Sequence, residues 1–332
     1  MNYIGSKYRL LPFLEESIDE YVSGSLKDMV FCDLFAGTGA VGRFFKQRCS
    51  RIIANDLEYY SYVLNRYYVG SVSTLNVAKK IEALNNLKGE QGFIYSHYCR
   101  GGHGERNYFK DENGLRIDAI RMQIEQWKEH NILSEDEYFF LLASLLESAD
   151  KVANTASVYG AYLKHIKKSA QQDMVLKPAE QIHGGVGHEV YQSDANETIK
   201  RVNGDILYLD PPYNARQYGS NYHILNTIAK YESFEPKGVT GLPDYSRSAY
   251  CSKGSVSNSF EELIANASFR YIFLSYNNEG LMTHEEITTI LEKYGRVGLK
   301  TKAYQRFKAD KTENRNHRAT ETLEYLFCLE KK

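Results

Sequence analysis

The chain has 332 residues, of which 42% are hydrophobic and 25% charged, and its formal net charge is −1. This balance is typical of a globular protein with a full core and excludes a disordered chain or a coiled coil. No apolar run is long enough to cross a bilayer, and the N-terminus lacks a signal-peptide core, so we expect a cytoplasmic protein. The near-neutral charge argues against a strongly basic nucleic-acid binder, although a local basic groove can coexist with an acidic remainder.

The first region, residues 1–75, alternates strand and helix patterns. The apolar run 29–35 predicts a buried strand that ends at a glycine-rich turn. Residues 40–48 follow with apolar side chains on one helical face, and residues 51–56 predict the next strand. This βαβ pattern predicts a parallel sheet.

The middle region, residues 76–189, has a helical character. Apolar residues recur at helical spacing between Ile117 and Trp127. Ser134 and Glu137 have the spacing of a capping box and stand before a second apolar helix.

The rest of the chain returns to strand and helix alternation. Residues 205–209 and 271–276 predict strands, and a capping pattern at Thr283 predicts a helix after them. Residues 297–307 and 322–329 predict two final strands. No long crossover separates these two, so we expect them to pair antiparallel.

The simplest organisation is a discontinuous domain. Residues 1–75 and 190–332 would share one α/β sheet. Residues 76–189 would form a mostly helical insertion that ends at the glycine-rich loop 183–188.

The cysteines are odd in number, and no two have C-x-x-C spacing. They are Cys32, Cys49, Cys99, Cys251 and Cys328. We therefore expect reduced thiols and no disulfide framework. His97, Cys99 and His103 lie close together but have no partner pair elsewhere, so a polar loop is favoured over a zinc site and we expect no metal.

A glycine-rich turn separates the first strand from its helix. Gly37, Gly39 and Gly42 satisfy G-x-G-x-x-G, and Asp56 ends the next strand about twenty residues on. Such glycines let the backbone approach a ligand, and the acidic residue can bind two ribose hydroxyls. S-adenosylmethionine and NAD both carry an adenosine ribose. The turn therefore indicates a nucleoside cofactor and leaves a nicotinamide-dependent oxidoreductase open.

A second turn, Asp210-Pro211-Pro212-Tyr213, directly follows the apolar run that ends at residue 209. It therefore lies at the carboxyl end of a strand, where open α/β sheets bind ligands. The two prolines fix the backbone and present carbonyl acceptors. One carboxylate and one carbonyl match an amino group with two N–H donors, and Tyr213 offers a flat face for a base.

With both turns present, the sequence resembles the Dam-like DNA adenine-specific (N6) methyltransferases, which depend on S-adenosylmethionine. The matching segments follow the family's order along the chain. They are Tyr3-Ile-Gly-Ser-Lys7, Phe35-Ala-Gly-Thr-Gly39, Asp194 and Asp210-Pro-Pro-Tyr213. Tyr3 stands where the family often has Trp. The resemblance covers residues 1–75 and 190–332, and no motif match is claimed within the insertion.

The resemblance implies a Rossmann-like class I methyltransferase sheet, mostly parallel with seven strands, and a target adenine flipped out of the duplex. Asp210 and the Pro211 carbonyl would accept hydrogen bonds from its amino group while Pro212 keeps the turn rigid. Tyr213 would stack on the base. Transfer would be direct and would need no metal, because a sulfonium methyl is already activated.

The resemblance also implies a cofactor pocket and a set of partners. The pocket residues would be Tyr3, Lys7, Phe35, Gly37, Gly39, Asp56, Asp194 and Asp210. Asp194 matches a family residue that contacts the cofactor's adenine amino group. Double-stranded DNA would be the substrate, residues 76–189 would carry target recognition, and a cognate restriction endonuclease would fit this role.

Basic and aromatic clusters provide the expected DNA contacts, although such clusters are more often only a solvated face. They are Lys164, Lys167, Lys168, Arg216, Tyr218 and Arg315. Other readings stay open. An RNA methyltransferase or a cytosine N4 methyltransferase would use related chemistry. An oxidoreductase would leave residues 3–7 and 210–213 unused, and a non-catalytic DNA-binding module would need no intact cofactor pocket.

Overall fold

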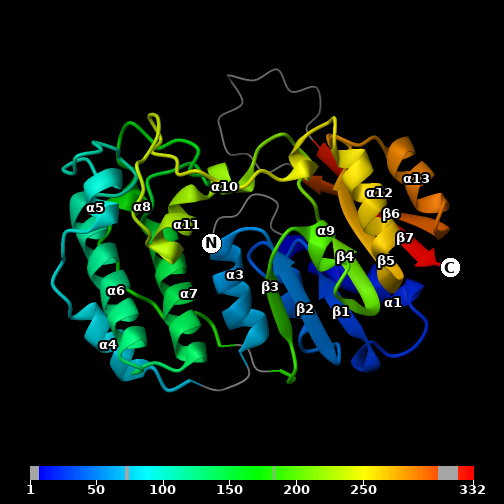
Figure 1. Cartoon of the computed structure of the whole chain (residues 1–332), viewed down its shortest axis with the longest axis horizontal. Helices are drawn as coiled ribbons and strands as arrows, with labels where there is room; N and C mark the ends of the chain where they lie inside the picture. Colours follow the sequence, from blue (N-terminus) through cyan, green and yellow to red (C-terminus); the bar gives the residue numbers. More distant parts are fainter. Residues whose placement is uncertain (1–6, 72–74, 182–183, 306–320) are drawn as a thin grey trace. The chain divides into compact units, whose positions relative to one another are not determined.

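The computed structural model describes residues 7–71, 75–181, 184–305 and 321–332. The chain forms two compact units (Figure 1). The sheet unit comprises Gly5–Leu57, Gly184–Gln217 and Ser246–Lys332. The helical unit comprises Glu58–His183 and Tyr218–Tyr245.

The described residues of the sheet unit form one seven-stranded sheet in the order β3-β2-β1-β4-β5-β7-β6. The strands are β1 (Val30–Asp33), β2 (Arg51–Asp56), β3 (Glu189–Gln192), β4 (Asn203–Leu209), β5 (Ser268–Asn277), β6 (Gly295–Gln305) and β7 (Glu321–Lys331). Strands β1 to β5 pair in parallel, whereas β7 runs antiparallel to both β5 and β6. The expected mostly parallel sheet with an antiparallel final pair is thus confirmed.

Helices cover both faces of this sheet. They are α1 (Leu11–Tyr21), α2 (Ala40–Phe45), α9 (Ala195–Thr198), α12 (Val256–Asn266) and α13 (His284–Glu292). Successive strand side chains point to opposite faces. Phe31 of β1 stacks on Phe45 of α2 at 4.3 Å between ring centroids, whereas Cys32 joins the core under α9, α12 and α13. The capping box predicted at Thr283 is present, with the Glu286 N–H donating to its hydroxyl at 3.1 Å.

The helical unit packs its helices around an aromatic core. Its longer elements are α3 (Tyr59–Asn65), α4 (Ala78–Asn85), α5 (Phe93–Tyr98), α6 (Asp111–Glu129), α7 (Glu135–Val152) and α11 (His223–Lys230), and the shorter ones are α8 (Lys168–Gln171) and α10 (Tyr218–Asn221). The capping box predicted at Ser134 opens α7, since Ser134 and Glu137 bond reciprocally at 3.2 and 2.9 Å.

The compact helical unit is larger than the insertion 76–189 expected from the sequence. It begins at Glu58 and also takes in 218–245. The cause is aromatic packing: the Tyr60 ring of α3 meets Tyr222 at 5.5 Å, and both are fully buried in this unit's core. Both segments lie close in sequence to the glycine-rich turn or to the Asp-Pro-Pro-Tyr turn. On sequence alone they are therefore expected in the sheet domain.

Candidate active site

The glycine-rich turn after β1 is held by two carboxylates. Gly37 and Gly39 have φ of 52° and 76°, in the left-handed region that favours glycine. The Gly37 N–H donates to Asp56 Oδ2 at 2.8 Å, and the Gly42 N–H donates to Asp33 Oδ2 at 3.0 Å. The ends of β1 and β2 therefore fix the shape of the turn from both sides.

Asp33 is the buried carboxyl beneath this turn, with 1% of its surface exposed. Its Oδ1 has no hydrogen-bond partner among the described residues. Burial raises the pKa of Asp33 to about 8, and the nearby Asp210 and Asp56 charges add to the shift although the Gly42 N–H opposes it. A buried carboxyl with an unsatisfied oxygen beneath a glycine-rich turn marks this turn as a candidate functional site.

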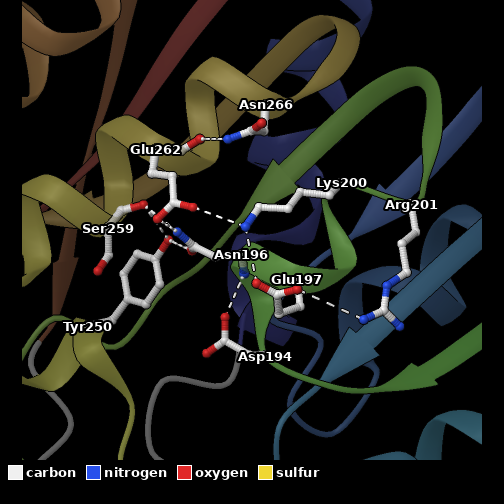
Figure 2. A network of polar contacts seen from close by, with 9 residues as sticks. All are labelled: Asp194, Asn196, Glu197, Lys200, Arg201, Tyr250, Ser259, Glu262 and Asn266. Atoms are coloured by element: carbon white, nitrogen blue, oxygen red, sulfur yellow. Dashed lines mark hydrogen bonds and ion pairs between the residues drawn. The ribbon is translucent and has the colours of Figure 1, made fainter.

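Phe35 and Asp194, both expected in the cofactor pocket, belong to this unit. The half-buried Phe35 ring meets the edge of Tyr250 at 5.0 Å with an interplanar angle of 76°. Asp194 Oδ1 accepts the backbone N–H of Asn196 at 2.8 Å (Figure 2). The Tyr250 hydroxyl in turn donates to Asn196 Oδ1 at 2.8 Å. Tyr250 and Asn196 were not identified from the sequence.

The Asp-Pro-Pro-Tyr turn leaves β4 at its carboxyl end, as predicted. Pro211 is buried, and Asp210, Pro212 and Tyr213 are half-buried. The Tyr213 carbonyl accepts the Leu281 N–H at 3.0 Å, and the Tyr213 side chain packs against the core of the sheet unit. The turn is thus anchored while the Asp210 carboxylate remains accessible.

A buried ammonium holds the Asp210 carboxylate. Lys7 Nζ lies 3.2 Å from Asp210 Oδ1 and also bonds to Glu324 Oε1 of β7. The side chains of Lys7 and Glu324 are each 9% exposed. Burial would lower the pKa of Lys7, but the two carboxylates outweigh it and hold that pKa well above its usual value. Burial raises the pKa of Asp210 to about 6, with Lys7 opposing and Glu324 reinforcing the shift.

Comparison with known proteins decides the class of enzyme. Residues 3–290 match the family model of the D12 class N6 adenine-specific DNA methyltransferases. The chain belongs to this family. It is therefore a methyltransferase that acts on N6 of adenine in DNA, as the sequence motifs predicted, and the oxidoreductase reading is not supported.

Several relatives of this methyltransferase share its full length. Type II methyltransferase M.NlaIII of Neisseria lactamica is 60% identical over 100% of this chain and 99% of its own. Type II methyltransferase M.CviAII of Paramecium bursaria Chlorella virus 1 is 39% identical over 99% and 98%. Type II methyltransferase M.FokI of Planomicrobium okeanokoites is 40% identical over 100% of this chain, which spans 53% of that relative.

Among solved structures, the rRNA methyltransferase aviRa of Streptomyces viridochromogenes covers 98% of this chain and 86% of its own. The TM-score is 0.35 at 9% identity. This likeness is too weak to carry an argument about fold or substrate.

The lysines expected to contact DNA do not form one solvated cluster. Lys164 and Lys168 are exposed, but Lys167 is half-buried and its Nζ donates to the Thr155 carbonyl at 2.7 Å. Burial lowers the pKa of Lys167. Its ammonium is therefore committed to the backbone of the methyltransferase's helical unit.

The other expected DNA contacts are scattered. Arg216 is exposed just after the Asp-Pro-Pro-Tyr turn, where its N–H donates to Asn214 Oδ1 at 2.9 Å. Tyr218 stacks on Tyr222 at 6.0 Å inside the helical unit. Tyr3 and Arg315 lie outside the described residues.

Two of the unforeseen residues of the sheet unit carried a sequence signal. Asp33 interrupts the apolar run 29–35, and a charged residue inside such a run calls for a specific partner. Glu324 shares a strand face with Leu326 and Cys328, which are buried. A carboxylate on that face predicts a buried cation, but the sequence does not say which one.

Within the described residues, no group of three or more His, Cys, Asp or Glu side chains could hold a metal ion. All five cysteines are free and buried. No helix in the described ranges is long and apolar enough to span a membrane.

Proposed function

We propose that this methyltransferase transfers the methyl group of S-adenosylmethionine to N6 of an adenine flipped out of double-stranded DNA. The proposal rests mainly on one observation: the glycine-rich turn after β1 and the Asp-Pro-Pro-Tyr turn after β4 follow neighbouring strands, at the point where the strand order reverses. Strand β1 pairs with β2 on one side and β4 on the other, so the glycine-rich turn and Asp210 lie at the carboxyl ends of neighbouring strands. Ligands of open α/β sheets bind at this switch point.

The residues present fit the proposed cofactor. The Asp56 carboxylate suits ribose hydroxyls, and the orphaned Asp33 Oδ1 needs a polar partner. The residues that would hold or border the cofactor are Tyr3, Lys7, Phe35, Gly37, Gly39, Asp56, Asp194 and Asp210. When bound, S-adenosylmethionine supplies a methyl group already activated as a sulfonium.

Asp210 would orient the target amino group. Lys7 engages Oδ1, which leaves Oδ2 to accept one N–H of the adenine, and the Pro211 carbonyl would accept the other. These bonds turn the nitrogen lone pair away from the ring, so positioning and electrostatics supply most of the rate. Because its pKa is about 6, Asp210 can take the proton that the methylated nitrogen sheds.

Neighbouring residues would support this orientation. Glu324 anchors the Lys7 ammonium, so the cation does not swing away from Asp210 when DNA enters. Pro212 keeps the turn rigid, and Tyr213 would provide the stacking face for the flipped base.

Target recognition would fall to the helical unit, including residues 76–189. Its exposed Lys164 and Lys168 can contact phosphate, and Arg216, Tyr218 and Arg315 complete the proposed DNA contacts. The relatives named as type II methyltransferases support a cytoplasmic role in protecting DNA from a cognate restriction endonuclease.

The direct test is incubation of labelled S-adenosylmethionine with duplex DNA or RNA, followed by nucleoside analysis. We expect label only in N6-methyldeoxyadenosine. Label in cytosine or in RNA would overturn the proposed substrate. Asp56→Ala should weaken cofactor binding by up to about 3 kcal/mol, the upper value for a charged hydrogen bond, as measured by calorimetry on the folded variant. Unchanged affinity would remove Asp56 from the pocket.

The stacking role of Tyr213 is tested on matched and mismatched duplexes. Tyr213→Phe keeps the ring and should stay active, whereas Tyr213→Ala should lose roughly 1–3 kcal/mol of base stabilisation. That loss should shrink when the target adenine faces a mismatch, since flipping then costs less. Equal damage by Phe and Ala would show that the hydroxyl matters instead.

A further inference from the structure

A polar network joins α9 to α12 in the sheet unit (Figure 2). At its centre the buried Asn196 side chain makes three hydrogen bonds. Its Nδ2 donates to the Ser259 carbonyl at 2.9 Å and to Glu262 Oε2 at 3.2 Å, and its Oδ1 accepts from the Tyr250 hydroxyl at 2.8 Å. Every polar atom of this amide is therefore engaged, which fixes its orientation.

Both ends of the network reach residues that the proposed function places in the cofactor pocket. The Asn196 backbone N–H donates to Asp194 Oδ1, and the Tyr250 ring supports the edge-on contact with Phe35. Phe35 follows β1 and Asp194 follows β3, two strands that are separated in the sheet by β2. Asn55 of β2 holds the backbone beside both residues, since its Nδ2 donates to the Leu34 and Ser193 carbonyls at 3.1 and 3.2 Å. The bond between Tyr250 and Asn196 adds a side-chain link between the Phe35 ring and the segment that carries Asp194.

Tyr250 itself has little freedom. It is 2% exposed, and its N–H donates to the Ser248 hydroxyl at 3.3 Å. A buried hydroxyl needs a partner, and Asn196 Oδ1 accepts from it at 2.8 Å, with the Ser259 carbonyl as a longer second acceptor at 3.3 Å. By contrast, the outer part of the network is solvated: Lys200 is 39% exposed where it bridges Glu197 and Glu262, so those ion pairs contribute little.

Resting on the proposed function, we propose that Tyr250 and Asn196 are positioning residues that make the cofactor pocket selective for a 6-amino purine. They set the spacing between the Phe35 ring and the Asp194 carboxylate. A carboxylate accepts hydrogen bonds from an amino group and repels the oxygen of a 6-oxo purine. Discrimination between the two therefore depends on how firmly Asp194 is held relative to the base plane.

The test compares binding of S-adenosylhomocysteine and S-inosylhomocysteine by calorimetry. The two ligands differ at the purine 6-position, amino in one and oxo in the other. Wild-type protein should prefer the adenosyl compound by at least about tenfold, the equivalent of 1.4 kcal/mol. Tyr250→Phe keeps the ring but loses the bond to Asn196, so the preference should fall about 2- to 10-fold.

Two further variants separate positioning from folding. Asn196→Ala removes the same bond from its other partner and should lower the preference by a similar factor. Tyr276→Phe is the matched control, because it removes a buried hydroxyl of the same core that bonds instead with the Met282 N–H. Lys200→Gln removes only the exposed ion pairs. Both controls should leave the preference unchanged.

The outcomes are distinguishable. If wild-type protein binds neither compound, the proposed cofactor is wrong. If wild-type protein discriminates and both Tyr250→Phe and Asn196→Ala retain the full preference, the positioning role is wrong while the proposed function stands. An equal loss of affinity for both compounds, with the ratio intact, would also overturn the positioning role, because that is what general destabilisation of the unit produces.

Discussion

Carboxyl groups of the two units differ in how many hydrogen-bond donors they contact. In the helical unit, Asp118 of α6 accepts the N–H groups of Gly92, Ile94 and Tyr95 at 3.1, 2.9 and 2.7 Å, and also the Tyr231 hydroxyl. The three N–H groups belong to the start of α5, which has no other side-chain cap. Asp118 is therefore saturated by the fold itself.

In the sheet unit, the buried Asp33 carboxyl and the half-buried Asp210 carboxylate have fewer partners. Asp33 has one backbone donor and a bare Oδ1, and Asp210 has one ammonium on Oδ1. An unsatisfied buried group costs stability, and natural proteins retain such groups mainly at functional sites. The difference lies in the number of partners: the fold saturates Asp118, whereas Asp33 and Asp210 retain acceptor positions that the proposed ligands would fill.

The largest expected effect on methyl transfer is that of replacing Asp210, which has few partners. Asp210→Ala should lower methyl transfer by about a thousandfold even at saturating DNA and cofactor, because the acceptor that orients the amino group is gone. Thermal unfolding should change little, since Asp210 has a single charged partner. Single-turnover methylation measures the loss of activity, and a melting curve measures thermal unfolding. An active variant would show that the Asp-Pro-Pro-Tyr turn is not the catalytic centre.

The pH profile sharpens this result. Asp210 must be ionised to accept an N–H, so the single-turnover rate of the wild-type protein should fall as pH drops through about 6. Lys7 and Glu324 are the charged groups that shift the pKa of this carboxyl, and the Asp210 charge in turn raises the pKa of Tyr208, Tyr213 and Asp33. Glu324→Gln removes a negative charge and should move the acid limb to lower pH. An acid limb at the wild-type position in Glu324→Gln would exclude this coupling.

Removal of the saturated acid should instead damage folding. Asp118→Ala leaves one buried and three part-buried donors without this acceptor and should lower the free energy of unfolding by about 3 kcal/mol. Cofactor affinity of the folded fraction should stay at the wild-type value. Asp111→Ala on the same helix is the control, because Asp111 accepts one exposed bond from Gly101. Equal destabilisation by both variants would contradict the comparison.

Asp33→Asn tests the incomplete acid through the pH dependence of stability. Since the unfolded carboxyl titrates near about 4 and the folded one near about 8, only the folded chain keeps the proton between these values. The wild-type protein therefore loses stability as pH rises through this window. The amide introduced by Asp33→Asn stays neutral, so the variant should gain stability relative to wild type across the window and show a constant difference below it. Urea unfolding at several pH values measures this, and a difference that does not change with pH would refute it.

The smallest effect should come from surface lysines of the helical unit. Replacing Lys164 and Lys168 together with Gln should flatten the dependence of DNA affinity on salt by about 0.9 per lost phosphate contact. Lys79→Gln with Lys88→Gln removes the same charge from exposed positions on and after α4. Fluorescence anisotropy over a salt series compares the two pairs. Identical slopes would place the phosphate contacts elsewhere.

Local signals explain which parts of the fold were predictable. The βαβ unit around the glycine-rich turn and the helices capped at Ser134 and Thr283 depend on residues within a few positions of each other. Strand β3 escaped prediction because it is a four-residue edge strand with no fully buried side chain. Helix α12 likewise lacks a side-chain cap at its start.

In the candidate site, too, the features that depend on nearby residues were predictable and the long-range contacts were not. The positions of Asp56 and Asp210 in the fold were predictable, because Asp56 ends β2 and Asp210 directly follows β4, each beside a recognisable turn. The pairing of Lys7 with Glu324 was not, since 317 positions separate them and only the antiparallel entry of β7 brings Glu324 to the carboxyl ends of the parallel strands. The Tyr250 to Asn196 bond is equally non-local and follows no spacing rule.

The three residues that pair around Lys7, namely Lys7, Asp210 and Glu324, are synthesised at very different times. During translation Lys7 leaves the ribosome first, Asp210 follows, and Glu324 emerges last, tens of seconds after Lys7 at ordinary elongation rates. A nascent chain can carry both recognisable turns while its ammonium still lacks the anchor on β7. On the proposed mechanism, Lys7 gains its second carboxylate, and Asp210 its fully anchored partner, only after β7 has been synthesised.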